Sequence, residues 1–295
     1  MPAYDPRLTP ARAEIAAKHL EGKVAAARFV EGRVMEVVEP QAPLRRAPRP
    51  DAPLETEALK GERVTVYEMN DEGWSWGQLN ADNYVGWLPS NALAAEGAPP
   101  THKVAALRTL VFPGPSIKFP PLEGLPLGAR IAVLRIEDRL AVTPPGGYVP
   151  AAHLKMIDDN ESDFVAVAER FLGTPYLWGG KTSFGLDCSG LLQVALTACG
   201  RVCPRDSDMQ EAALGAPVPH TVLSDLKRGD LLFWKGHVAI MRDRDTLIHA
   251  NAFHMAVAIE PMAAAVARIG AAGSAITSVK RIVTPGQVPA SDMRF

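Results

Sequence analysis

The sequence predicts an α+β protein, and three observations support this. Residues 31–157 hold short apolar runs separated by turn residues, which is typical of small β-barrels. Two helix patterns then follow each other between residues 162 and 200. From residue 230 onward, short strand patterns succeed one another, so the helices of this last part precede its antiparallel strands, as in α+β domains.

The first 30 residues are predicted to form an N-terminal helical segment, because alanine recurs through them behind a polar lead-in. Strands are expected from Val34 onward. Prolines at positions 40, 43, 48, 50 and 53 argue against a helix and predict an extended loop in this stretch.

Two internal repeats divide the strand-rich region into a first barrel, residues 31–97, and a second barrel, residues 98–157. Leu59 to Val66 matches Leu125 to Val133 with the same glycine-to-strand spacing, and Tyr84 to Leu93 resembles Tyr148 to Leu154. The first repeat carries three tryptophans, at positions 74, 76 and 87, which the second lacks. They either fill the barrel core or form a ligand wall.

The third predicted domain covers residues 158–295 and opens with an amphipathic helix. Its apolar residues recur at helical spacing from Phe164, with Ser162 as the expected N-cap and Gly173 as the expected C-cap. A second helix pattern starts at Cys188, between Asp187 as N-cap and Gly200 as C-cap. A β-meander is predicted from residue 230 to residue 283.

Cys188 is a candidate nucleophile, because it lies where a glycine-rich loop turns into a helix. The unpaired N–H groups and the positive end of the helix dipole favour the reactive thiolate there. Taken alone, a free cysteine is more often a small buried apolar residue, and Cys199 and Cys203 fit that description.

Two of the seven histidines lie in strand patterns that can bring them together. His237 opens the predicted strand to Met241, and His249 lies near the end of the next one. Antiparallel pairing through the turn at residues 243–245 would place both at one end of the sheet, where they could serve Cys188 as base and orienting group. A zinc site of Cys188, His237 and His249 stays open on spacing alone, as does a weaker metal half-site or redox pair at Cys199 and Cys203.

Five separated motifs together resemble the NlpC/p60 family of papain-like cysteine peptidases. The motifs are Pro175-Tyr-Leu-Trp-Gly-Gly, Asp187-Cys-Ser-Gly, Gly229-Asp-Leu, Gly236-His-Val-Ala-Ile and Ile248-His-Ala. The resemblance covers about residues 158 to 284, and the two segments before it resemble bacterial SH3-like barrels. The combination is similar to γ-D-glutamyl-L-diamino acid endopeptidases, which cut short cell-wall peptides.

This resemblance implies roles for four catalytic residues. Cys188 would be the nucleophile, His237 the general base and His249 the group that orients it. The Cys188 backbone N–H and the Tyr176 hydroxyl would form the oxyanion hole. Tyr176 as a simple packing residue is the alternative.

The resemblance also implies a substrate pocket for a free N-terminal amine. Its candidates are Asp187, Ser189, Asp206, Ser207, Trp178 and, in the first barrel, Tyr84 with either Asp51 or Glu55. Carboxylate and hydroxyl acceptors suit a buried ammonium group. The alternative for Asp206 is a turn cap.

The expected activity is hydrolysis of the bond between γ-D-Glu and a diamino acid, meso-diaminopimelate or lysine, in murein peptides with a free L-Ala amine. Such an enzyme would trim small peptides in peptidoglycan recycling. The alternatives are an exported hydrolase of intact cell wall, an NlpC-type acyltransferase and a non-catalytic binding protein. No metal or organic cofactor is expected.

Composition narrows the expected partners and compartment. A net charge of −2 over 295 residues gives no electrostatic case for nucleic acid. Charges throughout residues 5–20 argue against a signal peptide, and Glu260, Pro261 and Arg268 interrupt the longest apolar window, so no membrane segment is expected. Three cysteines, an odd number, fit a reducing compartment, and the cytoplasm is the expected location.

Overall fold

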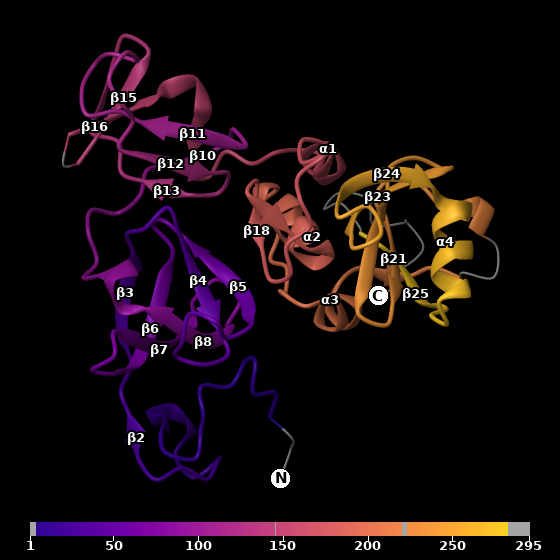
Figure 1. Ribbon diagram of the computed structural model, residues 1–295, viewed down its shortest axis with the longest axis horizontal. Coiled ribbons are helices and arrows are strands. Elements are labelled where there is room, and N and C mark those ends of the chain that lie inside the picture. The colour runs from indigo at the N-terminus through magenta and orange to yellow at the C-terminus, as the bar shows by residue number, and fades with distance from the viewer. Residues whose placement is uncertain (1–3, 145, 220–222, 283–295) are drawn as a thin grey trace, which may run out of the picture. The chain divides into compact units, whose positions relative to one another are not determined.

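The computed structural model describes residues 4–144, 146–219 and 223–282, and it divides into two compact units (Figure 1). The first unit comprises Met1–Asn160 with Leu177–Gly185, and the second comprises Glu161–Tyr176 with Leu186–Phe295. The chain therefore enters the second unit, returns to the first for one short segment, and re-enters the second just before Cys188.

The predicted N-terminal helix is wrong for the described residues 4–30. They form the strand β1 (Ala16–Ala17), a 3-10 turn (Lys18–Leu20) and the strand β2 (Phe29–Val30), and β1 pairs with β2 in parallel. Ile15 is fully buried in a cluster with the three tryptophans of the following sheet, and Arg12 stacks over the rings of two of them. Packing of an extended segment on these rings outweighs the helix propensity of alanine.

Residues 33–94 form one seven-stranded sheet in the order β5-β4-β8-β7-β6-β3-β9. The strands are β3 (Arg33–Val37), β4 (Gln41–Arg45), β5 (Leu54–Leu59), β6 (Arg63–Met69), β7 (Trp74–Leu79), β8 (Val85–Pro89) and β9 (Leu93–Ala94), with a 3-10 turn at Ser90–Ala92. The proline-rich stretch predicted as a loop supplies β4, with Pro43 inside it. Trp74, Trp76 and Trp87 are buried, so they fill a core rather than line a ligand surface.

Residues 102–156 form smaller antiparallel sheets around a separate apolar core of residues such as Val104, Leu125 and Val149. The elements are β10 (His102–Val104), β11 (Arg108–Val111), β12 (Glu123–Pro126), β13 (Arg130–Ile131), β14 (Arg135–Glu137), β15 (Leu140–Thr143), β16 (Gly147–Pro150), a 3-10 turn (Ala151–His153) and β17 (Leu154–Met156). Gly61 and Gly128, the paired glycines of the two repeats, have φ of +80° and +91°, which explains why both repeats need glycine there. The domain boundaries at 97 and 157 stay predictions.

The segment Leu177–Gly185 packs on the first seven-stranded sheet. It carries β18 (Lys181–Thr182) and the start of β19 (Gly185–Leu186). The Lys181 backbone N–H donates to Glu57 over 2.8 Å, and its buried ammonium lies 3.4 Å from Glu62. At Gly179, with φ of +79°, an added Cβ would lie 2.5 Å from the Leu54 carbonyl oxygen. The loop that leads to Cys188 is therefore shaped by the first unit.

The second unit begins with the helix α1 (Phe164–Glu169), whose N-cap is Asp163 rather than the predicted Ser162. The Asp163 carboxylate accepts from the Val165 N–H, and a carboxylate is the stronger acceptor for these unpaired donors. The other helices are α2 (Cys188–Ala198), α3 (Ser207–Ala213) and α4 (Met262–Ala271), with a 3-10 turn at Leu223–Asp225. Asp187 caps α2 as predicted, and Gly200, with φ of +71°, follows its end.

The strands of this unit form a six-stranded sheet in the order β20-β25-β21-β22-β23-β24. They are β20 (Ala216–Pro217), β21 (Asp230–Trp234), β22 (His237–Met241), β23 (Thr246–Asn251), β24 (Ala256–Pro261) and β25 (Ile276–Arg281). The predicted meander is correct from β21 to β24, but α4 then intervenes and β25 returns to pair with β21. The apolar run at 262–271 is thus a helix on the sheet.

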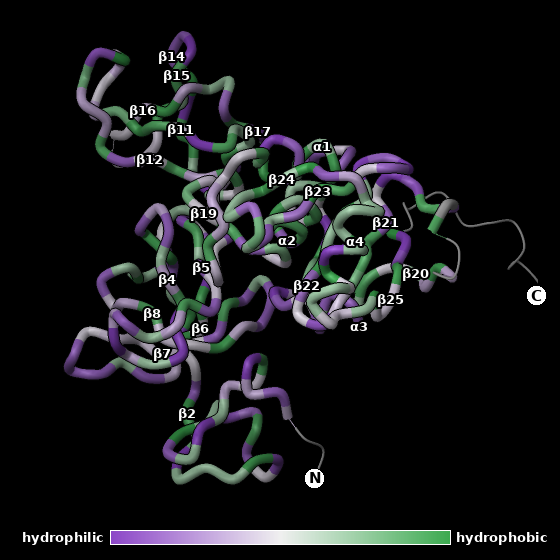
Figure 2. The backbone as a smooth tube through the Cα atoms, turned by 45° about the vertical axis from the view of Figure 1, so that its right-hand side comes forward, coloured by the Kyte–Doolittle hydropathy of each residue, from purple (hydrophilic) through white to green (hydrophobic). Residues whose placement is uncertain are grey.

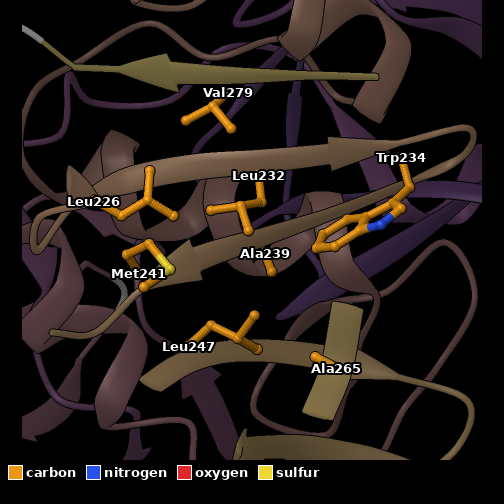
Figure 3. Close-up of a cluster of buried hydrophobic side chains, with 8 residues drawn as sticks. All are labelled: Leu226, Leu232, Trp234, Ala239, Met241, Leu247, Ala265 and Val279. Atoms are coloured by element: carbon orange, nitrogen blue, oxygen red, sulfur yellow. The ribbon is translucent and has the colours of Figure 1, made fainter. Parts of the chain in front are cut away.

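Apolar side chains cover both faces of the central strands of this sheet. On one face, Val279, Leu232, Ala239 and Leu247 follow one another across β25, β21, β22 and β23, with Ala265 of α4 against them (Figure 3). Figure 2 shows hydrophobic residues concentrated in α2 and in these strands. The sheet therefore gives α2 and the histidine strands a rigid support.

Among the described residues no helix has the length and apolar character needed to cross a bilayer.

Candidate active site

Cys188 is the first residue of α2 and is 7% exposed. The backbone N–H groups of Val238 and Ser189 point to its sulfur, so the thiol lies against the start of β22. This placement confirms that the helix start and the histidine strand converge. The pairing of Cys188 with His237 itself stays a prediction, because within the described residues no hydrogen bond joins the two side chains.

Burial at this site opposes the predicted thiolate form of Cys188. Burial raises the pKa of Cys188 to about 12, with a further contribution from the neighbouring Asp187 charge, and two backbone N–H groups only partly oppose it. Burial also lowers the pKa of His237 to about 3. Desolvation at this site opposes the helix N-terminus and favours a neutral thiol and a neutral imidazole.

This protonation state predicts how alkylation of Cys188 depends on pH. We expect the rate of Cys188 modification by iodoacetamide to rise about tenfold per pH unit between about pH 6 and pH 9, because the reactive thiolate is then a growing minor species. Peptide mass spectrometry separates Cys188 from Cys199 and Cys203. A rate that stays constant across this range would instead show a thiolate–imidazolium pair in the free enzyme.

His237 and His249 are joined as the sequence predicts. His237 Nε2 lies 2.9 Å from His249 Nδ1, and the two rings come from the neighbouring strands β22 and β23. His249 is 1% exposed, and burial lowers its pKa to about 3. The arrangement gives a thiol, a base and an orienting imidazole in one unit, which is the set that acyl transfer to cysteine needs.

Tyr176 also lies at this site. It forms a bridge with Leu186, two residues before Cys188 in sequence, and its backbone N–H donates to Met255. Burial, followed by the nearby Cys188 and Asp187, raises the pKa of its phenol, so the hydroxyl remains a hydrogen-bond donor. A donor beside the thiol fits the predicted oxyanion role, and that role stays a prediction.

Asp187 and Ser189, predicted to contact substrate, are both buried and bonded to Arg205. The Arg205 guanidinium, 1% exposed, makes two hydrogen bonds to Asp187, at 2.7 and 2.9 Å, and one to the Ser189 hydroxyl at 2.9 Å. Ser189 in turn donates to Asp187, which also caps Gly190. These contacts balance the Asp187 charge inside the protein, and the predicted substrate contacts of Asp187 and Ser189 stay a prediction. The pair fixes the start of α2.

The same network brings Asp206 and Ser207 toward the cysteine helix, since both directly follow Arg205. Gln210, fully buried on α3, donates to the Ser189 carbonyl over 2.9 Å and holds the two segments together. Asp206 is half-buried at the N-cap position of α3, but its side chain does not cap that helix. The choice between a substrate contact and a turn cap for Asp206 therefore stays a prediction.

The remaining predicted pocket residues lie in the first unit. Tyr84 is 1% exposed, and its hydroxyl lies 3.4 Å from Glu55, which is paired with Arg46. Asp51 is exposed and pairs with Arg49. The structure thus joins Tyr84 to Glu55 rather than to Asp51. Trp178 is 67% exposed on the segment that leads toward Cys188.

The other cysteines and four further side chains complete the description of the site. All three cysteines are free thiols, and Cys203 is buried against the Pro204 carbonyl, as a packing residue is. Sequence patterns did not identify three residues that contact predicted site residues, namely Arg205, Gln210 and Glu260, nor Arg268, which bonds to Glu260. The arginine next to Asp206 and the polar Glu260 at the end of an apolar strand were the available signals.

Comparison with known proteins supports this geometry. Residues 173–268 match the model of the NlpC/P60 family, and residues 44–93 match a bacterial dipeptidyl-peptidase Sh3 domain. A γ-D-glutamyl-L-lysine dipeptidyl-peptidase of Bacillus cereus is 30% identical over 246 residues, covering 71% of each chain. The chain belongs to the NlpC/P60 family. It is accordingly a cysteine peptidase with an N-terminal bacterial SH3 domain.

Further relatives agree with this membership. The γ-D-glutamyl-L-lysine dipeptidyl-peptidase of Bacillus subtilis is 45% identical over 73 residues, 24% of this chain and 23% of the relative. A crystal structure of an NlpC/P60 family protein from Bacillus cereus superposes with a TM-score of 0.72 at 21% identity, covering 85% of this chain and all of that one. The structural match confirms the α+β fold predicted for this NlpC/P60 protein.

Proposed function

We propose that this NlpC/P60 peptidase hydrolyses the bond between γ-D-Glu and the diamino acid of murein peptides that carry a free N-terminal L-Ala. The observation that carries the proposal is the Cys188, His237 and His249 constellation at the start of α2, in a chain whose relative is named a γ-D-glutamyl-L-lysine dipeptidyl-peptidase. A dipeptidyl-peptidase releases two residues from an N-terminus, as cleavage after L-Ala-γ-D-Glu would.

In the proposed reaction, the Cys188 sulfur attacks the γ-carbonyl carbon of D-Glu while its proton moves to His237. The Tyr176 hydroxyl and the Cys188 N–H stabilise the oxygen that becomes negative. The amide C–N bond then breaks, and His237 returns the proton to the amine of the departing diamino acid. Water, deprotonated by His237, hydrolyses the thioester and releases L-Ala-D-Glu and the free thiol.

Recognition of the free amine is assigned to acidic residues. In the second unit the candidates are Asp206 and Ser207, together with Asp187 and Ser189, which also bond to Arg205. The paired Tyr84 and Glu55 of the first unit stay a prediction from the family resemblance. A free amine requirement would restrict the enzyme to small peptides, and we propose a role in peptide recycling in the cytoplasm.

Digestion of L-Ala-γ-D-Glu-diaminopimelate beside its N-acetylated form tests this proposal. We expect cleavage of the free tripeptide only, because an acetylated amine has no charge for a carboxylate to balance. Asp206→Asn and Glu55→Gln should each reduce cleavage of the free peptide. The reduction should be about tenfold or more for the variant of the residue that contacts the ammonium group. Mass spectrometry identifies the products, and a lysine-containing tripeptide measures the third-residue preference.

Three results would change the proposal. Equal cleavage of both tripeptides, together with release of peptides from whole sacculi, would favour a hydrolase of intact wall. Transfer of the acyl group to an added amine in place of water would favour an acyltransferase. If Asp206→Asn and Glu55→Gln both keep the native ratio of free to acetylated tripeptide cleavage, neither Asp206 nor Glu55 recognises the amine.

A further inference from the structure

A diagonal row of polar side chains crosses three neighbouring strands of the peptidase sheet. Ile240 pairs with Ile248 between β22 and β23, and Leu247 pairs with Glu260 between β23 and β24. Continuing these registers makes His237 and Glu260 the diagonal neighbours of His249 on its own face of the sheet. Diagonal neighbours in antiparallel strands stay within reach of long side chains.

Hydrogen bonds run along the whole row. His237 Nε2 lies 2.9 Å from His249 Nδ1, and His249 Nε2 lies 2.8 Å from Glu260 Oε1. The Arg268 guanidinium, from α4, donates to the same Glu260 oxygen and stacks over the Phe253 ring with its carbon 4.3 Å from the ring centroid. Both ring nitrogens of His249 are therefore occupied, and the row ends on a carboxylate that an arginine holds in place.

These contacts fix where the protons lie. A carboxylate paired with arginine offers only acceptors, so His249 must donate from Nε2. A neutral imidazole has one donor and one acceptor, so His249 Nδ1 accepts and His237 Nε2 must donate. His237 then keeps its proton on Nε2, and its Nδ1 lone pair is the only ring nitrogen of the pair free to accept a proton.

We infer that Glu260, held by Arg268, is a positioning residue that sets the tautomers of both histidines and so leaves His237 Nδ1 as the base for Cys188. The inference rests on the proposed role of His237 as the base. When His237 takes the thiol proton on Nδ1, its positive charge stays on the ring, stabilised by the hydrogen bond from its Nε2 to His249 Nδ1, whose own Nε2 proton is held by the Glu260 carboxylate. Glu260 accordingly acts in the step without touching substrate.

A metal ligand and a structural anchor are the alternative roles for Glu260. His249, His254 and Glu260 could in principle hold a metal ion, but the Arg268 cation already occupies the carboxylate and His254 Nδ1 lies 3.0 Å from Asn251 Oδ1. The Glu260–Arg268 pair could also serve only to attach α4 to β24. That role would leave the histidine tautomers unchanged on mutation, which separates it from the inference.

Nitrogen-15 NMR of the histidine rings in the full-length protein tests the tautomers directly and needs no substrate. We expect both His237 and His249 to be protonated on Nε2 in the native enzyme. Glu260→Leu should convert His249 to a mixture of tautomers, whereas Glu260→Gln, which keeps an acceptor oxygen, should preserve the native pattern. Glu169→Leu is the matched control, since Glu169, on α1, is also a carboxylate paired with arginines, Arg228 and Arg242.

Kinetics with the free tripeptide supply the second readout. We expect Glu260→Leu to lower kcat by about 10- to 100-fold with little change in KM, and Glu260→Gln to lose less. In the His249→Ala background, Glu260→Leu should cause no further loss, because its effect passes through that ring. Glu169→Leu should leave kcat unchanged.

Native His249 protonated on Nδ1 would overturn the inference, as would native tautomers in a folded Glu260→Leu variant. Losses that add in the double variant would also contradict it, because they would show a structural role independent of His249. Failure of the native enzyme to cleave the tripeptide would instead count against the proposed substrate, while the tautomer measurement would still decide the role of Glu260.

Discussion

We expect Cys188→Ala to abolish peptide cleavage, by at least about 10⁴-fold in kcat, and to leave the protein folded. Without the sulfur no thioester can form, and the remaining histidines and oxyanion donors act only weakly on water. Alanine fits the same first-turn position of α2 and preserves the Asp187 cap on Gly190. Steady-state cleavage of the tripeptide and a thermal melt measure the two outcomes.

Cys199→Ala is the matched control for that variant. Cys199 is a half-buried free thiol at the C-cap position of the same helix, eleven residues away from the nucleophile. Its replacement should leave kcat within about twofold of the native value, as is usual for substitutions away from the reacting groups. Retained cleavage in Cys188→Ala would remove Cys188 from the mechanism, and lost cleavage in Cys199→Ala would point to general damage.

The second large effect is on stability. We expect Arg205→Met to lower the free energy of unfolding of the peptidase unit by about 3–5 kcal/mol, because it leaves the buried Asp187 carboxylate without its cation. Ser189 loses a donor as well. Urea denaturation followed by tryptophan fluorescence measures the effect, with Trp234 as the reporter buried in this unit.

A double variant separates the ion pair from simple packing. Asparagine at position 187 can still cap Gly190 but carries no charge, so Asp187→Asn combined with Arg205→Met should be less destabilised than Arg205→Met alone. If the double variant instead loses the sum of the two single effects, the buried charge is not the cause. An Arg205→Met protein as stable as the native one would contradict the structural role of this network.

Local sequence patterns predicted the fold correctly where neighbouring residues decide the structure. Asp187 before an apolar periodic run identified the start of α2, and strand patterns at His237 and His249 identified the paired strands. These patterns failed where distant packing decides. Ala16 and Ala17 favour a helix locally, yet they form an extended strand, next to Ile15 packed on the tryptophan cluster. No local signal distinguishes these two outcomes.

In the candidate site too, local sequence patterns identified some residues, and contacts between distant segments decide the others. Motif spacing identified the cysteine proposed as nucleophile and the two hydrogen-bonded histidines. The partners of the neighbouring groups, Arg205 for Asp187 and Glu260 for His249, depend on strand register and helix packing. Burial, which raises the pKa of Cys188, opposes the expected thiolate, and the sequence shows a helix N-terminus but not the degree of burial. The protonation of the thiol therefore stays a prediction that the alkylation rates test.

Trapping of the acyl-enzyme decides whether Cys188 forms the thioester. The enzyme is mixed with L-Ala-γ-D-Glu-diaminopimelate, quenched in acid within the first turnover, and studied by intact-protein and peptide mass spectrometry. We expect a mass increase equal to one L-Ala-γ-D-Glu acyl group, located on Cys188 and absent from Cys188→Ala. Cleavage of the tripeptide without any adduct, or an adduct on another residue, would contradict nucleophilic catalysis by Cys188.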